Sequence, residues 1–146
     1  MKSAIIDLDG TLSDNTHREH LIEGENKKWR DYLQKSSEDE VHEEILEFVQ
    51  KLSDEYKIVI LTCRSDEVKD KTIKWLKEKQ IPFDNLIMLP EDRWKLADSE
   101  FKRKKLENIE NPKIAIDNKE ENCKMFQKQG LKVYTVREGS PKKHNS

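Results

Sequence analysis

The sequence predicts one α/β domain with a parallel sheet of about five strands flanked by helices. Five short apolar runs predict the strands, since strands covered on both faces lack the alternation of half-exposed ones. Amphipathic segments separate the runs, and strands that alternate with helices form parallel sheets. The runs cover residues 5–6, 58–61, 86–89, 114–116 and 133–136. Parallel connections then bring the carboxyl ends of the strands to one edge, where ligands usually bind.

The helices follow from caps and periodicity. Ser37 and Glu40 have the spacing of a capping box, which predicts a helix from there to about Ser53. Amphipathic patterns predict further helices over 67–79, 98–108 and 119–129, the last ended by Gly130. Residues 13–35 show weak periodicity, and we expect a small helical cap insertion over the active edge. The polar tail at 137–146 is expected to be flexible.

Composition narrows the class of protein. A chain of 146 residues fits a single domain covering 1–146, and its net charge of -2 does not demand a nucleic-acid partner. Without an apolar run of about 18 residues, no membrane span is expected. With no apolar leader, the two cysteines, Cys63 and Cys123, indicate reduced thiols and a cytoplasmic protein. No glycine-rich nucleotide loop occurs, so we do not expect an NTP kinase or a dinucleotide enzyme.

Two aspartates follow the first apolar run in the segment Asp7-Leu8-Asp9-Gly10-Thr11. Alternate residues of a strand point the same way, so both carboxylates can reach one point beyond the strand end. Such a pair also occurs in ordinary turns before glycine. Because two buried carboxylates need a cation or a shared proton, we favour a metal-assisted site with one nucleophile and one acid/base group.

Polar residues also follow two other strands. Thr62 and Arg64 come after the second run, where a hydroxyl, a guanidinium and a helix N-terminus suit a phosphate. A helix cap and a surface ion pair are the simpler interpretations of these two residues. Cys63 between them lacks the C-x5-R spacing of a cysteine phosphatase. Asp117 ends the fourth run, and a third carboxylate on one edge suits Mg²⁺, although a lone aspartate there usually caps a helix.

A cation is needed to balance this charge, and four consecutive residues, 102–105, compete for the role. On a helix whose buried side carries Phe101 and Leu106, Lys102 and Lys105 fall within the buried stripe. Lys102 is nearer the helix N-terminus and therefore the active edge, where a cation opposes the helix dipole and purely structural stabilisation is less natural. The alternative is a lysine whose stem is buried and whose charge reaches solvent.

Three weaker candidates lie in or near the insertion. His17 and His20 have the spacing of a metal pair on a helix, but the sequence shows no third ligand nearby. Arg18 and Arg93 lie in segments that could overhang the site, although exposed arginines are usually solvated.

Together these motifs resemble those of the haloacid dehalogenase (HAD) superfamily of phosphatases, over about residues 3 to 136. Asp7 to Thr11 resembles its first motif, Thr62 the second, Lys102 the third, and Asp117-Asn118 the fourth. Within the superfamily the chain is most similar to the 3′-phosphatase domain of phage-type polynucleotide kinases. Thr62-Cys63-Arg64, the position of Arg18 and the Asp98-x-x-x-Lys102 helix carry this closer resemblance. Asn118 departs from the family, which usually has a second aspartate there.

The resemblance implies a Rossmann-like, HAD-like fold and a defined set of roles. Asp7 would be the nucleophile that forms an aspartyl-phosphate, and Asp9 the general acid and base. Asp9 would then need a raised pKa while Asp7 stays ionised. Mg²⁺ would be held by the Asp7 and Asp117 side chains and the Asp9 carbonyl, with Asn118 holding a metal-bound water. Catalysis is thus assigned to Asp7, Asp9 and Lys102, and substrate or phosphate binding to Gly10, Thr11, Arg18, Thr62, Cys63 and Arg64.

The predicted function is removal of a 3′-phosphate from polynucleotide ends, as in nucleic acid end repair. A nucleotidase or another small-molecule phosphatase is the first alternative, and a non-catalytic phosphate-binding module the second. The small insertion at 13–35 favours a polymer end, since a large cap would enclose a small substrate. The sequence leaves open DNA or RNA, a 3′ or 5′ end, a cyclic phosphate and the oligomeric state; no membrane partner is expected.

Overall fold

The computed structural model describes residues 1–91 and 97–144, and its centre is a six-stranded sheet. The strand order is β5-β4-β1-β6-β7-β8, and every pair is parallel except β7 and β8. This confirms the predicted α/β class with a mostly parallel sheet. The strands are β1 (Ser3–Ile6), β4 (Lys57–Ser65), β5 (Asn85–Leu89), β6 (Pro112–Ile116), β7 (Lys132–Arg137) and β8 (Ser140–Lys143).

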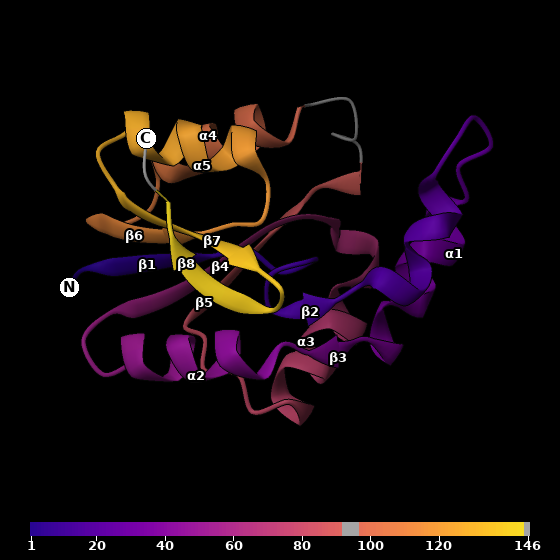
Figure 1. Cartoon of the computed structure of the whole chain (residues 1–146), viewed down its shortest axis with the longest axis horizontal. Helices are drawn as coiled ribbons and strands as arrows, with labels where there is room; N and C mark the ends of the chain where they lie inside the picture. Colours follow the sequence, from indigo (N-terminus) through magenta and orange to yellow (C-terminus); the bar gives the residue numbers. More distant parts are fainter. Residues whose placement is uncertain (92–96, 145–146) are drawn as a thin grey trace.

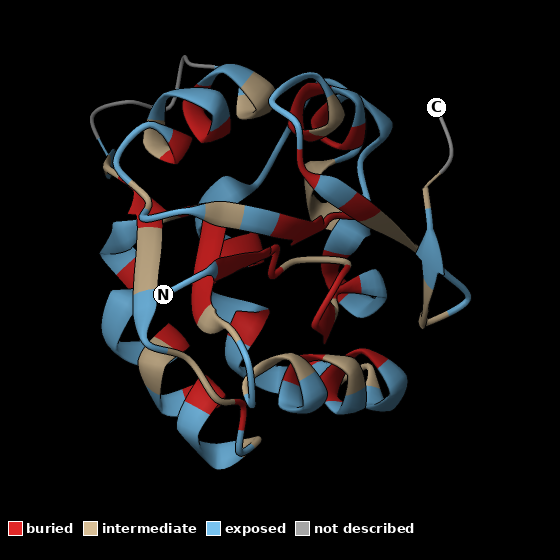
Figure 2. Ribbon diagram, turned by 90° about the vertical axis from the view of Figure 1, so that its left-hand side faces the viewer, coloured by how far each residue is buried: buried red, intermediate tan, exposed pale blue. Residues whose placement is uncertain are grey.

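Helices cover both faces of the sheet, as Figure 1 shows. On one face lie α2 (Glu43–Leu52) and α3 (Lys69–Glu78), and on the other α4 (Asp98–Leu106) and α5 (Glu120–Lys128). The two faces have separate cores because successive strand residues point to opposite sides. Within β1, Ala4 and Ile6 pack toward α2 and α3, whereas Ile5 packs toward α4 and α5. Buried residues accordingly concentrate in the strands and the inward sides of the helices (Figure 2).

The insertion after β1 forms a cap beyond the carboxyl ends of the strands (Figure 1). It contains β2 (Ser13–Asp14), the 3₁₀ helix η1 (Thr16–Ile22) and α1 (Trp29–Gln34). The short α1 packs on η1, and Tyr32 and Leu33 join Val68 and Met88 in a small third core. This core attaches the cap to the domain next to the edge at which Asp7 lies.

The predicted capping box at Ser37 and Glu40 is wrong. Residues Lys35–Glu38 form the 3₁₀ helix η2, Glu40–Val41 form β3, and α2 begins only at Glu43. Strand β3 pairs with β2 of the cap, and the Asp39 side chain bonds to side chains of η1 instead of capping a helix. A partner distant in sequence therefore overrides the local capping signal.

Part of the tail that the sequence predicts to be flexible is instead a strand, because Ser140–Lys143 form β8 against β7. Glu138 and Gly139 between the strands both have positive φ, 51° and 76°. Two such residues make a tight turn whose twist matches an antiparallel hairpin. The Glu-Gly pair after an apolar run is the sequence pattern that indicates this hairpin. In the described part of the chain, no helix has the length and apolarity needed to cross a bilayer.

Candidate active site

The carboxyl ends of three adjacent strands, β4, β1 and β6, carry most of the predicted site. Asp7 follows β1, Asp117 follows β6, and Thr62 and Arg64 lie in the last part of β4. The carboxyl ends of these strands, the cap and the start of α4 border a cavity of about 960 Å³. Its lining includes Asp7, Asp9, Trp29, Thr62, Arg64 and Lys102. Residues separated by most of the chain are therefore brought to one pocket.

Asp7 is buried and held on both carboxylate oxygens. The Thr11 hydroxyl donates to Oδ2 at 2.8 Å, and Lys102 Nζ donates to Oδ1 at 2.8 Å. The same Nζ donates to Asp117 Oδ2 at 2.7 Å, so Lys102 bridges the two carboxylates. Burial and the nearby Asp117 charge raise the pKa of Asp7 to about 6 although Lys102 opposes the shift. Two carboxylates with one ammonium leave this corner short of positive charge.

Asp9 has a different set of partners. Arg18 Nη2 donates to its Oδ1 at 2.6 Å, Arg64 Nη2 to the same oxygen at 2.5 Å, and Arg64 Nε to Oδ2 at 3.3 Å. Burial alone would raise the pKa of Asp9, but Arg64 and Arg18 outweigh it and hold the pKa at about 2. The pKa shifts of the two aspartates thus run opposite to the predicted ones, because two guanidinium groups converge on Asp9.

Arg18 is fully buried, and its hydrogen bonds all go to protein groups. Nε and Nη2 donate to Asp39 at 2.8 and 2.7 Å, and Nη1 donates to the Tyr32 carbonyl at 3.1 Å. The guanidinium also stacks on the Tyr32 ring, 4.1 Å from its centroid. The sequence predicts contact with the substrate for this arginine. That role stays a prediction; in this structure the Arg18 guanidinium pairs with Asp9 and Asp39 beneath the cap.

Asp39 is a residue that the sequence interpretation missed. Its buried carboxylate binds Arg18 and accepts from His17 at 2.7 Å, and its carbonyl accepts from the Trp75 indole at 2.8 Å. It thus connects the cap, α3 and the arginine that holds Asp9. No local sequence pattern predicts the role of Asp39, because its side-chain partners His17, Arg18 and Arg64 each lie more than 20 residues away.

Replacing Asp39 should therefore destabilise the fold. We expect Asp39→Ala to lower the free energy of unfolding by about 3 kcal/mol, since it leaves a buried guanidinium with one carboxylate partner fewer. Urea denaturation measures the effect, and Asp31→Ala on the exposed side of α1 is the matched control, expected to change stability by less than about 0.5 kcal/mol. A loss below about 1 kcal/mol for Asp39→Ala would contradict this assignment.

The remaining predicted residues lie around the same cavity. Thr62 accepts from the Arg64 amide at 3.0 Å, which leaves its hydroxyl proton for another acceptor. Burial raises the pKa of the Cys63 thiol, so it stays protonated and is a poor nucleophile. Gly10 has φ +81°, and a Cβ there would lie 2.3 Å from Asn118 Nδ2. This close approach requires glycine and sets the Asn118 amide against the Asp7–Thr11 turn.

The histidine pair does not form a metal site in this structure. His17 binds Asp39, His20 is exposed, and the described residues contain no group of three or more His, Cys, Asp or Glu side chains placed to hold a metal. Arg93 lies outside the described residues.

Residues 1–140 match the family model described as "Polynucleotide kinase PNKP phosphatase domain". The chain belongs to the PNKP phosphatase domain family. The resemblance predicted from the motifs is confirmed, and the protein is a HAD-type phosphatase. Comparison with curated protein sequences gives no significant match.

Solved structures agree with the family in fold. Chains of two structures titled as Pnkp1/Rnl/Hen1 complexes, one called an RNA repair complex, superpose with TM-scores of 0.75 and 0.74 at 23% and 22% identity. Each covers 92% of this PNKP-family chain, which spans only 42% and 45% of theirs. A putative HAD-hydrolase from Bacillus subtilis, titled as bound to magnesium, gives a TM-score of 0.64 at 12% identity over 90% of this chain and 86% of its own.

The residues of this PNKP-family site fit a hard divalent cation. Asp7 and Asp117 present oxygen ligands on either side of Lys102 Nζ, and burial together with the Asp117 charge raises the pKa of Asp7. The buried Asn122 Oδ1 has no hydrogen-bond partner among the described residues, and the amide nitrogen of that residue donates to Asp117 at 3.2 Å. Carboxylate and carbonyl oxygens are the ligands that Mg²⁺ prefers.

Proposed function

We propose that this protein is a Mg²⁺-dependent phosphomonoesterase that removes 3′-phosphates from polynucleotide ends through an aspartyl-phosphate. The proposal rests on the different surroundings of the two aspartates, Asp7 and Asp9. Asp7 faces the cavity between Thr11 and Lys102, whereas Asp9 is paired with two arginines. Groups with separate environments can take separate chemical roles.

In the first step an Asp7 oxygen attacks phosphorus and the bond from phosphorus to the ester oxygen breaks. Thr11 and Lys102 orient the attacking carboxylate, and Lys102 with the Thr62 hydroxyl balances the charge on the phosphoryl oxygens. Asp9 gives a proton to the departing alcohol oxygen, because an alkoxide is a poor leaving group. The products are the aspartyl-phosphate on Asp7 and a free hydroxyl on the nucleoside.

Asp9 must gain a proton before this step, although Arg18 and Arg64 keep its pKa at about 2 in the free protein. A phosphate dianion entering the cavity competes for the guanidinium of Arg64, which lines the cavity, whereas Arg18 stays with Asp39. Loss of one guanidinium and arrival of negative charge both raise the pKa of a carboxyl group. Substrate binding thereby converts Asp9 into an acid.

In the second step Asp9, now ionised, takes a proton from water. That water oxygen bonds to phosphorus, the bond to Asp7 breaks, and phosphate leaves with the Asp7 carboxylate restored. Asp7, Asp117 and the Asp9 carbonyl would hold Mg²⁺, which supplies Lewis-acid stabilisation of the phosphoryl charge. Asn118, set against Gly10, would support a metal-bound water.

A substrate panel tests the proposal. We expect phosphate release from oligonucleotides ending in a 3′-phosphate, with little release from 5′-phosphate or 2′,3′-cyclic phosphate ends, and loss of turnover on chelation with EDTA. DNA and RNA versions of each oligonucleotide identify the preferred polymer. Failure to release phosphate from a generic aryl phosphate with Mg²⁺ would favour a non-catalytic phosphate-binding module instead.

Helix α4 carries both Lys102 and Lys105, so variants of the two lysines can be compared directly. We expect Lys102→Ala to lower kcat on the order of 10²-fold or more, because Lys102 is a preorganised charge stabiliser contacting Asp7 and Asp117. Lys105→Ala is the matched control, since Lys105 lies beside the Phe101 ring, 5.9 Å from its centroid, and should keep nearly full activity. Steady-state kinetics decide, and a larger loss in Lys105→Ala would overturn the assignment.

One observation favours the nucleotidase alternative. Four glutamates, Glu19, Glu23, Glu67 and Glu91, line the same cavity. Their carboxylates oppose additional phosphates inside the cavity, which favours a substrate with a single phosphate. Comparing kcat/KM for a nucleoside 3′-monophosphate and a 3′-phosphorylated oligonucleotide separates the two candidates.

A further inference from the structure

A large exposed aromatic side chain stands at the wall of the active-site cavity. Trp29 is 52% exposed and lines the cavity at the start of α1. Its edge rests on the Tyr32 ring, with centroids 5.9 Å apart and planes at 87°. Tyr32 also lines the cavity and carries the Arg18 guanidinium that holds Asp9. Two side chains therefore connect the indole to the carboxylate that protonates the leaving group.

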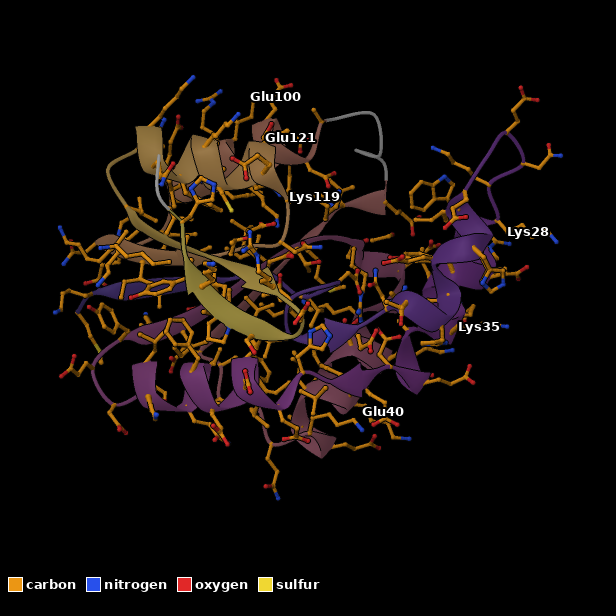
Figure 3. All side chains as sticks on the ribbon, viewed as in Figure 1. Lys28, Lys35, Glu40, Glu100, Lys119 and Glu121 are labelled. Atoms are coloured by element: carbon orange, nitrogen blue, oxygen red, sulfur yellow. The ribbon has the colours of Figure 1, made fainter. Side chains whose placement is uncertain are left out.

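Basic residues flank the indole in the segment Lys27-Lys28-Trp29-Arg30, and all three are exposed. Lys27 Nζ lies 5.8 Å from the centroid of the Trp29 ring. Lys27, Lys28 and Arg30 are outside the cavity lining, and Figure 3 places Lys28 on the outer side of the cap. Glu19 and Glu23 of the cap line the cavity, whereas Lys27, Lys28 and Arg30 of the cap lie outside its lining.

This combination suits one class of ligand, single-stranded nucleic acid. An aromatic face stacks on a base of any sequence, and neighbouring cations neutralise the phosphodiester backbone. The unstacked face of a base is available only in a single strand or a frayed end. An exposed tryptophan between cations, beside a phosphate-cleaving site, is poorly explained by packing, because about half of its surface stays accessible to solvent.

We infer that residues 27–30 form a platform for a single-stranded polynucleotide end. This inference rests on the proposed function. Trp29 stacks on the terminal base while the 3′-phosphate lies at Asp7, and Lys27, Lys28 and Arg30 bind the backbone as it leaves the cavity. The glutamates of the lining leave room for one terminal nucleotide and direct the remaining phosphates outward, over the basic segment.

The stacking role is tested with Trp29→Ala and Trp29→Phe. Substrates are a 3′-phosphorylated oligonucleotide and the same oligonucleotide whose terminal nucleotide lacks its base. We expect Trp29→Ala to raise KM for the complete end about 10-fold, to leave KM for the base-free end nearly unchanged, and Trp29→Phe to restore most of the loss. Equal losses on both substrates, or no loss, would overturn the platform.

The basic flank is tested with the double variant Lys27→Ala/Lys28→Ala. We expect KM for the oligonucleotide to rise while KM for a nucleoside 3′-monophosphate stays the same. The slope of log KM against log[salt] should fall by about 0.7 for each backbone phosphate of the single strand that the variant no longer neutralises. Lys51→Ala, at the end of α2 on the opposite edge of the sheet, is the matched control and should change neither value. An unchanged slope in the double variant would overturn the flank assignment.

Binding measured without turnover keeps the two proposals apart. The anisotropy of a 5′-fluorescein-labelled oligonucleotide reports affinity whether or not phosphate is released. Trp29-dependent binding with no 3′-phosphate release would overturn the proposed function and retain the platform. Rapid 3′-phosphate release with identical binding by wild type and Trp29→Ala would overturn the platform and retain the function.

Discussion

Asp7→Asn is expected to lower phosphate release on the order of 10⁴-fold or more, as for the loss of a covalent nucleophile elsewhere. The amide cannot attack phosphorus as a carboxylate does, yet it keeps the size of the side chain. Its oxygen can accept from Lys102, and its nitrogen can donate to the Thr11 hydroxyl oxygen. The fold should therefore survive. Mg²⁺-dependent release of phosphate from a 3′-phosphorylated oligonucleotide measures the loss.

A control and a direct chemical readout accompany this variant. Asp54→Asn, in the exposed turn after α2 and remote from the cavity, should retain full activity. Acid quenching of wild type during turnover should trap one phosphoryl group on the peptide containing Asp7, and Asp7→Asn should trap none. Robust turnover by Asp7→Asn would remove the covalent mechanism, even though the fold assignment would stand.

Asp9→Asn should also abolish removal of nucleoside phosphates, and its effect should depend on the leaving group. A general acid contributes about 10² to 10⁴-fold when the departing oxygen would otherwise leave as an alkoxide. With an aryl phosphate the departing phenolate needs no proton, so the loss in the first step should be much smaller. In the aryl reaction Asp9→Asn should then accumulate the aspartyl-phosphate, because no general base activates the water of the second step.

Comparing aryl with nucleoside phosphates separates the acid/base role of Asp9 from its structural role. Asp9 also neutralises Arg18 and Arg64, so a loss caused only by disturbed arginines would be equal for aryl and nucleoside phosphates. Urea denaturation of Asp9→Asn measures the structural part independently. Equal losses together with a lowered unfolding free energy would contradict a role for Asp9 as general acid.

The strands were predictable because both faces of the sheet are covered. Runs such as 58–61 and 114–116 are apolar on successive residues, and no helix of ordinary length would have so short a pattern. The position of Asp7, Thr62 and Asp117 on one edge followed from parallel topology alone. The same reasoning cannot find β8, whose sequence Ser-Pro-Lys-Lys is polar and pairs only because the Glu138-Gly139 turn folds it back.

The partners of the arginines required the tertiary structure. Asp9, Arg18, Asp39 and Arg64 form one network, but they come from the β1 turn, η1, the segment before β3, and β4. Each residue taken separately has an ordinary local role, such as the helix cap assigned to the Asp39 region. The electrostatic result, an Asp9 pKa below that of Asp7, depends on distances that no spacing in the sequence encodes.

The central position of β1 has a consequence for synthesis. Its Ser3 pairs with Lys57 on one side and with Pro112 on the other, so β1 is synthesised before both of the strands that it pairs with. Lys102, which reaches Asp7 across 95 residues, also emerges late. Pairing between distant segments is slow, and unpaired apolar strands aggregate. A nascent chain would therefore hold β1 and the Asp7–Thr11 motif without their native partners until most of the domain has been translated.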